Sequence, residues 1–218
     1  MDAVIESLRP ALRASIVRLA LDASESQVDQ LLGHLALLQR WNSHYNLTSV
    51  RDPAQMLTQH LSDCLAVIAP LRRECGSAST RLLDVGSGGG LPGVVLAVLN
   101  PAMHVTCVDT VGKKAAFIQQ VAGELRLRNL HAQHARVEQL KAAPFDVSAS
   151  RAFASLVDFT ALTRPHLSVT GRWMAMKGKE PVDEISALPD DIDVFHVEQL
   201  AVPGLNAERC LVWMQPKS

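Results

Sequence analysis

The sequence predicts an α/β protein in which a doubly wound, mostly parallel sheet follows a small helical N-terminal region. Three observations predict this. Apolar residues recur at helical spacing up to about residue 75, short apolar runs alternate with helical stretches from residue 81, and a glycine-rich loop directly follows the first of these runs. Of the 218 residues, 48% are hydrophobic and 20% are charged, which excludes a disordered chain. We expect residues 1–75 to pack on a domain formed by residues 76–218.

The N-terminal region contains two predicted helix starts. Ser24 with Gln27 three residues later is typical of a capping box, and valine and leucine then recur at helical spacing. Residues 46–49 are predicted to break this helix. Asp52 followed by Pro53 predicts the next start, because it places an N-cap before a proline at the first helical position.

The second N-terminal helix carries one apolar stripe from Met56 to Ile68, which we expect to end before Pro70. The simplest interpretation of this stripe is a helix that packs on the rest of the protein. His60 lies on the stripe, and a histidine in such a place is more often a hydrogen-bonded core or edge residue than a catalytic one.

The predicted strands span residues 81–85, 104–109, 130–135, 145–150, 172–177, 193–200 and 209–214. The predicted helices between them span residues 92–99 and 111–125, and a third ends near residue 162. Such alternation implies a parallel sheet with right-handed crossovers. The last two strands lack a long helix between them, so we expect an antiparallel hairpin around Pro203 and Gly204.

Composition excludes several classes of protein. The longest apolar run, residues 94–99, is far shorter than the roughly 18 residues of a membrane span. No apolar segment follows a basic start, so no secretory signal is expected. The four cysteines show no CxxC or CxxH spacing, which argues against a metal site and a disulfide framework. We therefore expect a cytoplasmic protein with reduced thiols and without a metal.

The net charge of −1 conceals a polarised chain. Residues 111–179 carry 11 basic and 4 acidic residues, whereas residues 180–218 carry 2 basic and 8 acidic residues. The basic segment is suited to holding phosphates of a nucleic acid. Solvated helix faces whose charges meet in space are the alternative interpretation.

The most informative segment runs from Asp84 to Gly93, with five glycines among its last eight residues. Such a loop between a strand and a helix lets a ligand touch the backbone. In one register, Gly88, Gly90 and Gly93 satisfy GxGxxG, a dinucleotide fingerprint that is a weak signal by itself. In the other register, the segment reads DxGxGxG, which is typical of class I methyltransferases that use S-adenosylmethionine (SAM).

Asp84 favours the second register. A pyrophosphate at a helix N-terminus is poorly served by a nearby carboxylate, whereas SAM carries an ammonium and a sulfonium and no phosphate. Asp109 ends the second strand, where its carboxylate can accept both ribose hydroxyls in either register. We therefore assign Gly86, Gly88 and Asp109 to a SAM site, and a nicotinamide cofactor is the weaker alternative.

Two later loops extend this assignment. After the third strand, Val137 can cover a face of the adenine and Glu138 can read its amino group. After the fourth strand, residues 150–153 differ from the NPPY-like tetrapeptide of exocyclic-amine methylases. No cysteine lies between residues 108 and 209 to act as the nucleophile of a cytosine-carbon methylase. Both of these reaction types are therefore disfavoured.

Several segments are unspecific alone and specific together: residues 41–42 with 45–52, 84–93, 109 with 112–114, 136–138, 151–154 and 177–178. Through them the chain resembles, over nearly its whole length, the bacterial small-subunit ribosomal RNA methyltransferase G family, also called glucose-inhibited division protein B. The resemblance implies a Rossmann-like class I SAM-dependent methyltransferase fold. Gly89 departs from the family pattern, because other members often have proline there, and we expect a slightly looser loop.

The resemblance further implies methylation of guanine nitrogen-7 in a loop of 16S rRNA of the small ribosomal subunit, with S-adenosylhomocysteine as the other product. The residues that it assigns to SAM are Gly86, Leu91, Val137, Glu138 and Arg151. Nitrogen-7 carries a lone pair and no proton, so it can attack the methyl group in line without a general base. Arg151 and Lys177 are candidates for positioning the substrate.

The target base must be unpaired, because side chains cannot reach nitrogen-7 in the deep groove of A-form RNA. The candidate RNA-binding residues are Lys113, Lys114, Phe153, Lys177 and Lys179. Each lysine is also compatible with an ordinary surface residue, and Phe153 with packing. We expect a monomer that binds the RNA or the 30S subunit and no membrane. The alternatives are a SAM-dependent small-molecule methyltransferase and a non-catalytic SAM-binding regulator.

Overall fold

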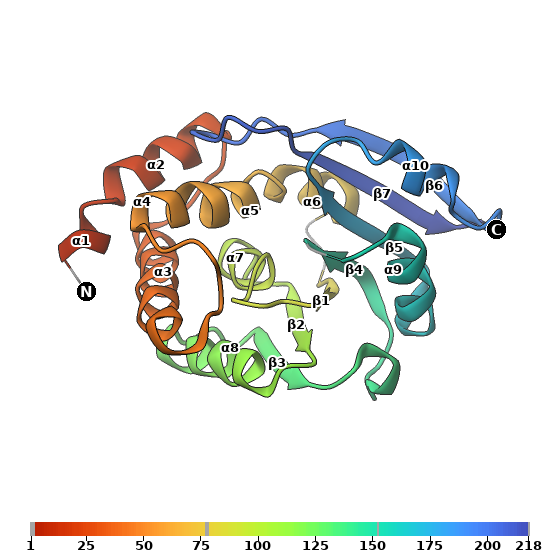
Figure 1. Ribbon diagram of the computed structural model, residues 1–218, viewed down its shortest axis with the longest axis horizontal. Helices are drawn as coiled ribbons and strands as arrows, with labels where there is room; N and C mark the ends of the chain where they lie inside the picture. The colour runs from red at the N-terminus through yellow and green to blue at the C-terminus, as the bar shows by residue number, and fades with distance from the viewer. Residues whose placement is uncertain (1–2, 77–78, 152, 218) are drawn as a thin grey trace.

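The computed structural model describes residues 3–76, 79–151 and 153–217. One seven-stranded sheet, in the order β3-β2-β1-β4-β5-β7-β6, crosses the molecule (Figure 1). The strands are β1 (Arg81–Val85), β2 (His104–Asp109), β3 (Leu130–His134), β4 (Phe145–Ser150), β5 (Leu167–Lys177), β6 (Ile192–Gln199) and β7 (Cys210–Pro216). Strands β1 to β5 pair in parallel, and β7 is antiparallel to both β5 and β6. The predicted doubly wound sheet with a C-terminal hairpin is confirmed.

The helices cover the two faces of the sheet unequally (Figure 1). In chain order they are α1 (Ala3–Glu6), α2 (Arg9–Arg18), α3 (Glu25–Tyr45), α4 (Pro53–Met56), a π-helical turn η1 (Leu57–Ser62), α5 (Asp63–Leu65), α6 (Ile68–Cys75), α7 (Gly93–Leu99), α8 (Gly112–Glu124), α9 (Leu156–Thr163) and α10 (Val182–Ser186), with short 3₁₀ turns at η2 (Val137–Gln139) and η3 (Arg164–His166). The N-terminal helices lie with α7 and α8 on one face, and α9 and α10 lie on the other. None of the helices in the described segments is long and apolar enough to cross a membrane.

Successive residues of a strand point to opposite faces, and β1 shows how this builds two cores. Leu82 packs in the larger hydrophobic cluster with helices α3, α5, α7 and α8. Leu83 packs in the smaller cluster with Phe159 of α9 and Trp173 of β5. The N-terminal helices are thus part of the larger core rather than a separate body. The boundary between residues 75 and 76 remains our proposal.

The capping signals of the N-terminal region are confirmed. Ser24 accepts a hydrogen bond from the Gln27 amide, and the Gln27 side chain accepts one from the Ser24 amide. Helix α3 ends before Asn46, which has a left-handed backbone. The Asp52 side chain caps α4 by accepting from the backbone amide of Gln55.

Two predicted boundaries differ from the structure. The helix that carries the apolar stripe ends before Pro70, at Leu65 of α5, but Ile68 belongs to the next helix, α6, where Pro70 lies in the first turn and its missing N–H breaks no helical hydrogen bond. Strand β5 begins at Leu167, not at residue 172. Its first residues do not alternate between buried and exposed positions in a strand pattern, and Val169 among them is fully exposed. They belong to the sheet because Leu167 pairs with Phe145 of β4.

Candidate active site

The glycine loop joins the carboxyl end of β1 to helix α7. Gly86 has φ of +70°, a left-handed conformation that residues with a side chain rarely adopt. At Gly93 the reason for glycine is close packing, because a Cβ atom there would lie 2.3 Å from Cys107 Sγ and 2.7 Å from Asp84 Oδ2. The sequence therefore needs glycine at one end of the loop for conformation and at the other for space.

Asp84 lies beneath this loop and is fully buried. Its Oδ2 accepts a hydrogen bond of 2.9 Å from the Gly93 amide at the start of α7, and its Oδ1 is buried without a partner among the described residues. Burial raises the pKa of Asp84 to about 6, and the hydrogen bond from Gly93 opposes that rise. Asp84 holds the loop to the helix.

Unlike Asp84, Asp109 at the end of β2 lines a cleft. Its Oδ2 accepts from the Gly88 amide at 3.0 Å, and its Oδ1 accepts from the Val111 amide at 2.9 Å. Lys114 Nζ lies 3.8 Å from Oδ2. Gly88 therefore uses its amide to fix Asp109, and the two strand ends are tied together.

A cleft of about 370 Å³, here called the first cleft, opens at the carboxyl ends of β1, β2 and β3. It is lined by Val85, Gly86, Val108, Asp109, Thr110, Ala135, Arg136, Val137, Glu138, Phe153, Ala154 and Leu162. Four residues assigned to the cofactor, Gly86, Asp109, Val137 and Glu138, lie together here. Gly88 and Leu91 do not line this cleft, and Leu91 is buried.

Phe153 also lines the first cleft, although the sequence suggested stacking on an RNA base. Its ring packs against Phe159, with 5.5 Å between the ring centroids. Val137 and Leu162 add further apolar surface. A flat ring system fits between such walls, and the Asp109 carboxylate suits hydroxyl groups, so the cleft has the chemistry of a nucleoside site.

A second cleft of about 390 Å³ opens at the carboxyl ends of β4 and β5. It is lined by Gln59, His60, Asp63, Arg151, Met176, Lys177, Gly178 and Arg209. The loop after β4 separates the two clefts, because Arg151 lines the second cleft whereas Phe153 and Ala154 line the first. Ala152, part of the tetrapeptide considered above, lies outside the described residues.

Arg151 was assigned to the cofactor, but its contacts are in the second cleft. Its guanidinium donates to the Gln59 carbonyl at 3.2 Å and to His60 Nδ1 at 3.4 Å. It also lies 3.6 Å from Asp63 Oδ2. Arg209 donates from Nε to Asp63 Oδ1 at 2.8 Å. The structure thus brings two arginines to one carboxylate.

His60 is buried and hydrogen-bonded, as predicted, but it also lines the second cleft. Its Nε2 bonds to Thr48 Oγ1 at 2.9 Å. Burial, aided by the positive charge of Arg151, lowers the pKa of His60 to about 4. The imidazole is therefore neutral at pH 7 and adds no charge to the cleft.

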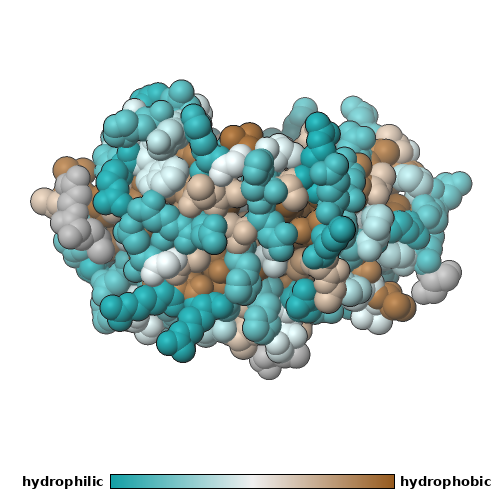
Figure 2. Space-filling model, turned by 90° about the horizontal axis from the view of Figure 1, so that it is seen from below, coloured by the Kyte–Doolittle hydropathy of each residue, from teal (hydrophilic) through white to brown (hydrophobic). Residues whose placement is uncertain are grey.

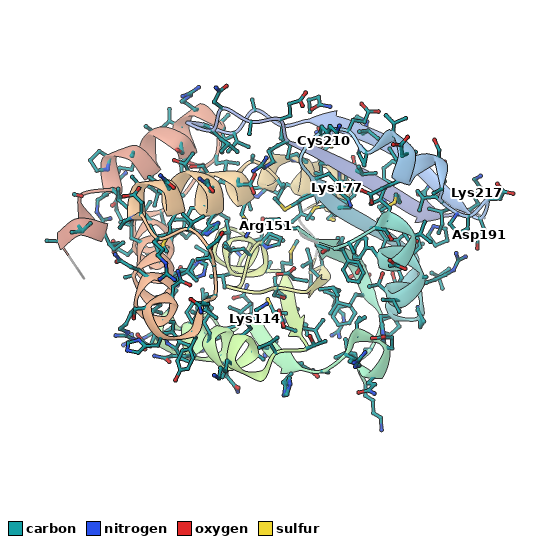
Figure 3. The ribbon with its side chains drawn as sticks, viewed as in Figure 1. Lys114, Arg151, Lys177, Asp191, Cys210 and Lys217 are labelled. Atoms are coloured by element: carbon teal, nitrogen blue, oxygen red, sulfur yellow. The ribbon has the colours of Figure 1, made fainter. Side chains whose placement is uncertain are left out.

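The candidate lysines lie in different surroundings. Lys177 donates to both carboxylate oxygens of Glu184, at 2.7 and 3.0 Å, so its charge is largely neutralised. Lys113 lies over the Tyr45 ring, 5.0 Å from its centroid, and Lys179 is exposed after β5. Figure 3 shows Lys114, Arg151 and Lys177 across the middle of the molecule, far from Lys217 near the C-terminus. The face in Figure 2 is mainly hydrophilic, with small hydrophobic patches.

Sequence reasoning missed Gln59, Asp63 and Arg209 as cleft residues. An acidic residue inside the apolar stripe was an available signal for Asp63. No local signal marks Arg209, because the fold alone brings it to the cleft. Within the described part of the chain, no three His, Cys, Asp or Glu residues are grouped to hold a metal ion.

Comparison with known sequences gives a consistent result. A family model described as rRNA small subunit methyltransferase G matches residues 27–212. "Ribosomal RNA small subunit methyltransferase G" of Leptothrix cholodnii is 64% identical over 210 residues, covering 96% of this chain and 96% of the relative. The protein of the same name from Acidovorax ebreus is 62% identical over 218 residues, also covering 96% of each chain.

Solved structures share the fold at low sequence identity. TrmN from Thermus thermophilus superimposes with a TM-score of 0.55 at 18% identity, covering 73% of this chain and 53% of that chain. A SAM dependent methyltransferase from Aquifex aeolicus gives a TM-score of 0.56 at 14% identity, covering 75% and 97%. These likenesses show the class I SAM-dependent methyltransferase fold.

Proposed function

We propose, from the premise that this chain belongs to the rRNA small subunit methyltransferase G family, that it methylates nitrogen-7 of an unpaired guanine in 16S rRNA. SAM-dependent methylation of ribosomal RNA follows from membership of the family. The base, the atom and the small-subunit RNA are our proposal. The observation that carries it is the adjacency of the two clefts, one with the chemistry of a nucleoside site and the other cationic, on either side of the loop after β4.

The first cleft fits SAM, which when bound supplies a methyl group activated by a sulfonium. Asp109 would accept hydrogen bonds from the ribose hydroxyls, while Val137 and Phe153 would cover the faces of the adenine. Glu138, which also lines the cleft, would read the adenine amino group. At Gly86 a Cβ atom would meet nothing within 4 Å, so the backbone there would leave room for the amino-acid end of the cofactor beside the glycine loop.

The second cleft takes the acceptor. Its arginines suit RNA phosphates, because an arginine that bound guanine at both O6 and nitrogen-7 would block the reacting atom. Arg151 and Arg209 therefore orient the nucleotide through its backbone. The nucleotide must leave its helix to enter, since nitrogen-7 of A-form RNA faces a groove that side chains do not reach.

The reaction requires no general base. The nitrogen-7 lone pair would form a bond to the methyl carbon as the sulfur–carbon bond breaks, so the positive charge would move from sulfur to the purine. The neutral His60 adds no positive charge to oppose that movement. The work of the chain is alignment, which can lower a barrier by about 7–11 kcal/mol.

The test uses labelled SAM with 30S subunits and with protein-free 16S rRNA, both from a strain that lacks this enzyme. We expect label in one of the two substrates, and mass spectrometry of nucleosides should identify 7-methylguanosine. Label in another nucleoside contradicts the nitrogen-7 assignment, and no label in either substrate contradicts the 16S assignment. We further expect a cytoplasmic monomer, to be checked by sedimentation in the presence and absence of RNA.

A further inference from the structure

Asp63 lies at the base of the second cleft and is only 3% exposed. It is the first residue of α5 and directly follows the π-helical turn η1, which contributes Gln59 and His60 to the same cleft. A π turn adds a residue to one helical turn and so changes which side chains face a neighbour, and such turns often occur at functional sites. The N-terminal helices thus supply one wall of the cleft.

The Asp63 carboxylate joins two arginines that are distant in sequence. Oδ1 accepts from Arg209 Nε at 2.8 Å, and Oδ2 lies 3.6 Å from the Arg151 guanidinium. The side chains of both arginines are 26% exposed, so each guanidinium can face a ligand while it is anchored from below. Without the carboxylate, two partly buried positive charges would repel one another.

We propose that Asp63 is a positioning residue for methyl transfer, which fixes the guanidinium groups of Arg151 and Arg209 toward the acceptor and does not itself touch the RNA. The inference rests on the proposed function, because it takes the second cleft as the acceptor site. It assigns the N-terminal helical region a direct part in the reaction, through a residue that neither the glycine loop nor the basic segment contains.

The proposal predicts that loss of the Asp63 charge lowers the rate of methyl transfer without weakening RNA binding. In Asp63→Asn, an amide oxygen can still accept from Arg209, but the negative charge is lost. The cleft becomes more positive, so electrostatic attraction of RNA does not weaken. The arginines lose their fixed direction, so alignment at the reacting atom suffers.

The experiment measures methyl transfer to 30S subunits and to protein-free 16S rRNA under saturating SAM, RNA affinity, and affinity for S-adenosylhomocysteine. We expect kcat to fall by about tenfold or more, with both affinities within about threefold of wild type. A loss of folding would instead reduce all three together. An unchanged kcat overturns the proposal.

Glu74→Gln is the matched control. Glu74 is 17% exposed and accepts a hydrogen bond of 2.8 Å from Arg172, so the change also neutralises a half-buried carboxylate paired with arginine. Glu74 lines neither cleft. We expect wild-type kcat for this variant, and an equal loss in both variants contradicts a positioning role.

Arg209→Met is the second variant, for use if Asp63→Asn does not fold. It removes the hydrogen-bond donor to Asp63 Oδ1 by changing a residue whose side chain is 26% exposed. A kcat loss of about tenfold is again expected, and an unchanged kcat overturns the proposal.

In the double variant Asp63→Asn, Arg209→Met, the fold-loss of kcat should be smaller than the product of the two single fold-losses, since both changes disturb one unit. Wild-type protein that methylates neither substrate contradicts the proposed function itself, whereas active wild type with an unaffected Asp63→Asn contradicts this inference alone.

Discussion

The two clefts lie side by side but are built in different ways. The first is formed by successive strand ends, and most of its lining residues follow β1, β2 and β3 in chain order. The second combines the N-terminal helices, the ends of β4 and β5, and Arg209 just before β7. A site made at successive strand ends is visible in a sequence, whereas a site made from distant segments requires the fold. Four perturbations sharpen this comparison.

The largest effect is expected at Asp109. In Asp109→Asn, one carboxylate oxygen becomes an amide donor, so the residue can no longer accept from both the Gly88 and Val111 amides. Affinity for S-adenosylhomocysteine, measured by calorimetry, should fall by about 100-fold. Asp191→Asn is the control, because Asp191 pairs with Arg164 at the far end of the molecule (Figure 3). Wild-type affinity in Asp109→Asn would show that the first cleft is not the cofactor site.

Arg151 tests the division between the clefts. Arg151→Met should lower methyl transfer by about 30-fold and leave the affinity for S-adenosylhomocysteine within about threefold of wild type. The reason is that its described contacts are with Gln59, His60 and Asp63. A tenfold loss of cofactor affinity would instead place Arg151 with the first cleft, as the family resemblance implies. Arg172→Met, which removes the partner of Glu74, is the control.

Gly93 tests whether packing fixes the glycine loop. A Cβ atom in Gly93→Ala would overlap Cys107 Sγ, which is buried, so the free energy of unfolding should fall by about 1–3 kcal/mol. Gly123→Ala is the matched change in α8, where a Cβ atom meets nothing within 4 Å, and it should stabilise by about 0.5–1 kcal/mol. Denaturant unfolding measures both. Equal effects of the two changes would contradict a packing role for Gly93.

His34 gives the smallest expected effect. It is fully buried on α3, bonded to the Gly89 carbonyl at 2.8 Å, and burial lowers its pKa to about 4. The unfolded chain therefore binds the proton more tightly, and stability is lost as pH falls below the unfolded pKa of roughly 6.5. Between pH 8 and pH 6 this loss is about 1 kcal/mol for one such histidine.

The measurement is the pH dependence of the free energy of unfolding for wild type and His34→Gln. Glutamine can still donate to Gly89 but does not titrate, so the variant should lack that loss. Protonation of Asp84 changes the free energy of unfolding in the opposite direction: because its pKa is raised to about 6, stability rises as pH falls through that value. This effect is the same in both proteins and cancels in their difference. Identical pH profiles would contradict a buried neutral His34 beneath the glycine loop.

Much of the fold could be predicted from local signals. Local signals predict the capping box at Ser24, the cap at Asp52 and the glycine loop. In each case residues close together in the chain satisfy the hydrogen bonds or the conformation that the backbone needs there. The bounds of strands β1 and β2 are predicted correctly because each is a short, largely buried segment that ends at an aspartate or at the glycine loop. The start of β5 was missed because Leu167 joins the sheet through its partner Phe145, and not through a pattern of its own.

The sequence by itself determined the α/β class, the glycine loop and the acid at the end of β2, because these depend on residues adjacent in the chain. Only the tertiary structure decided that Asp84 lies beneath the loop, that Arg151 turns to the second cleft, and that Asp63 joins it to Arg209. The physical reason is that the direction and partner of a polar side chain depend on what the fold packs against it, and these partners lie 88 and 146 residues away from Asp63 along the chain.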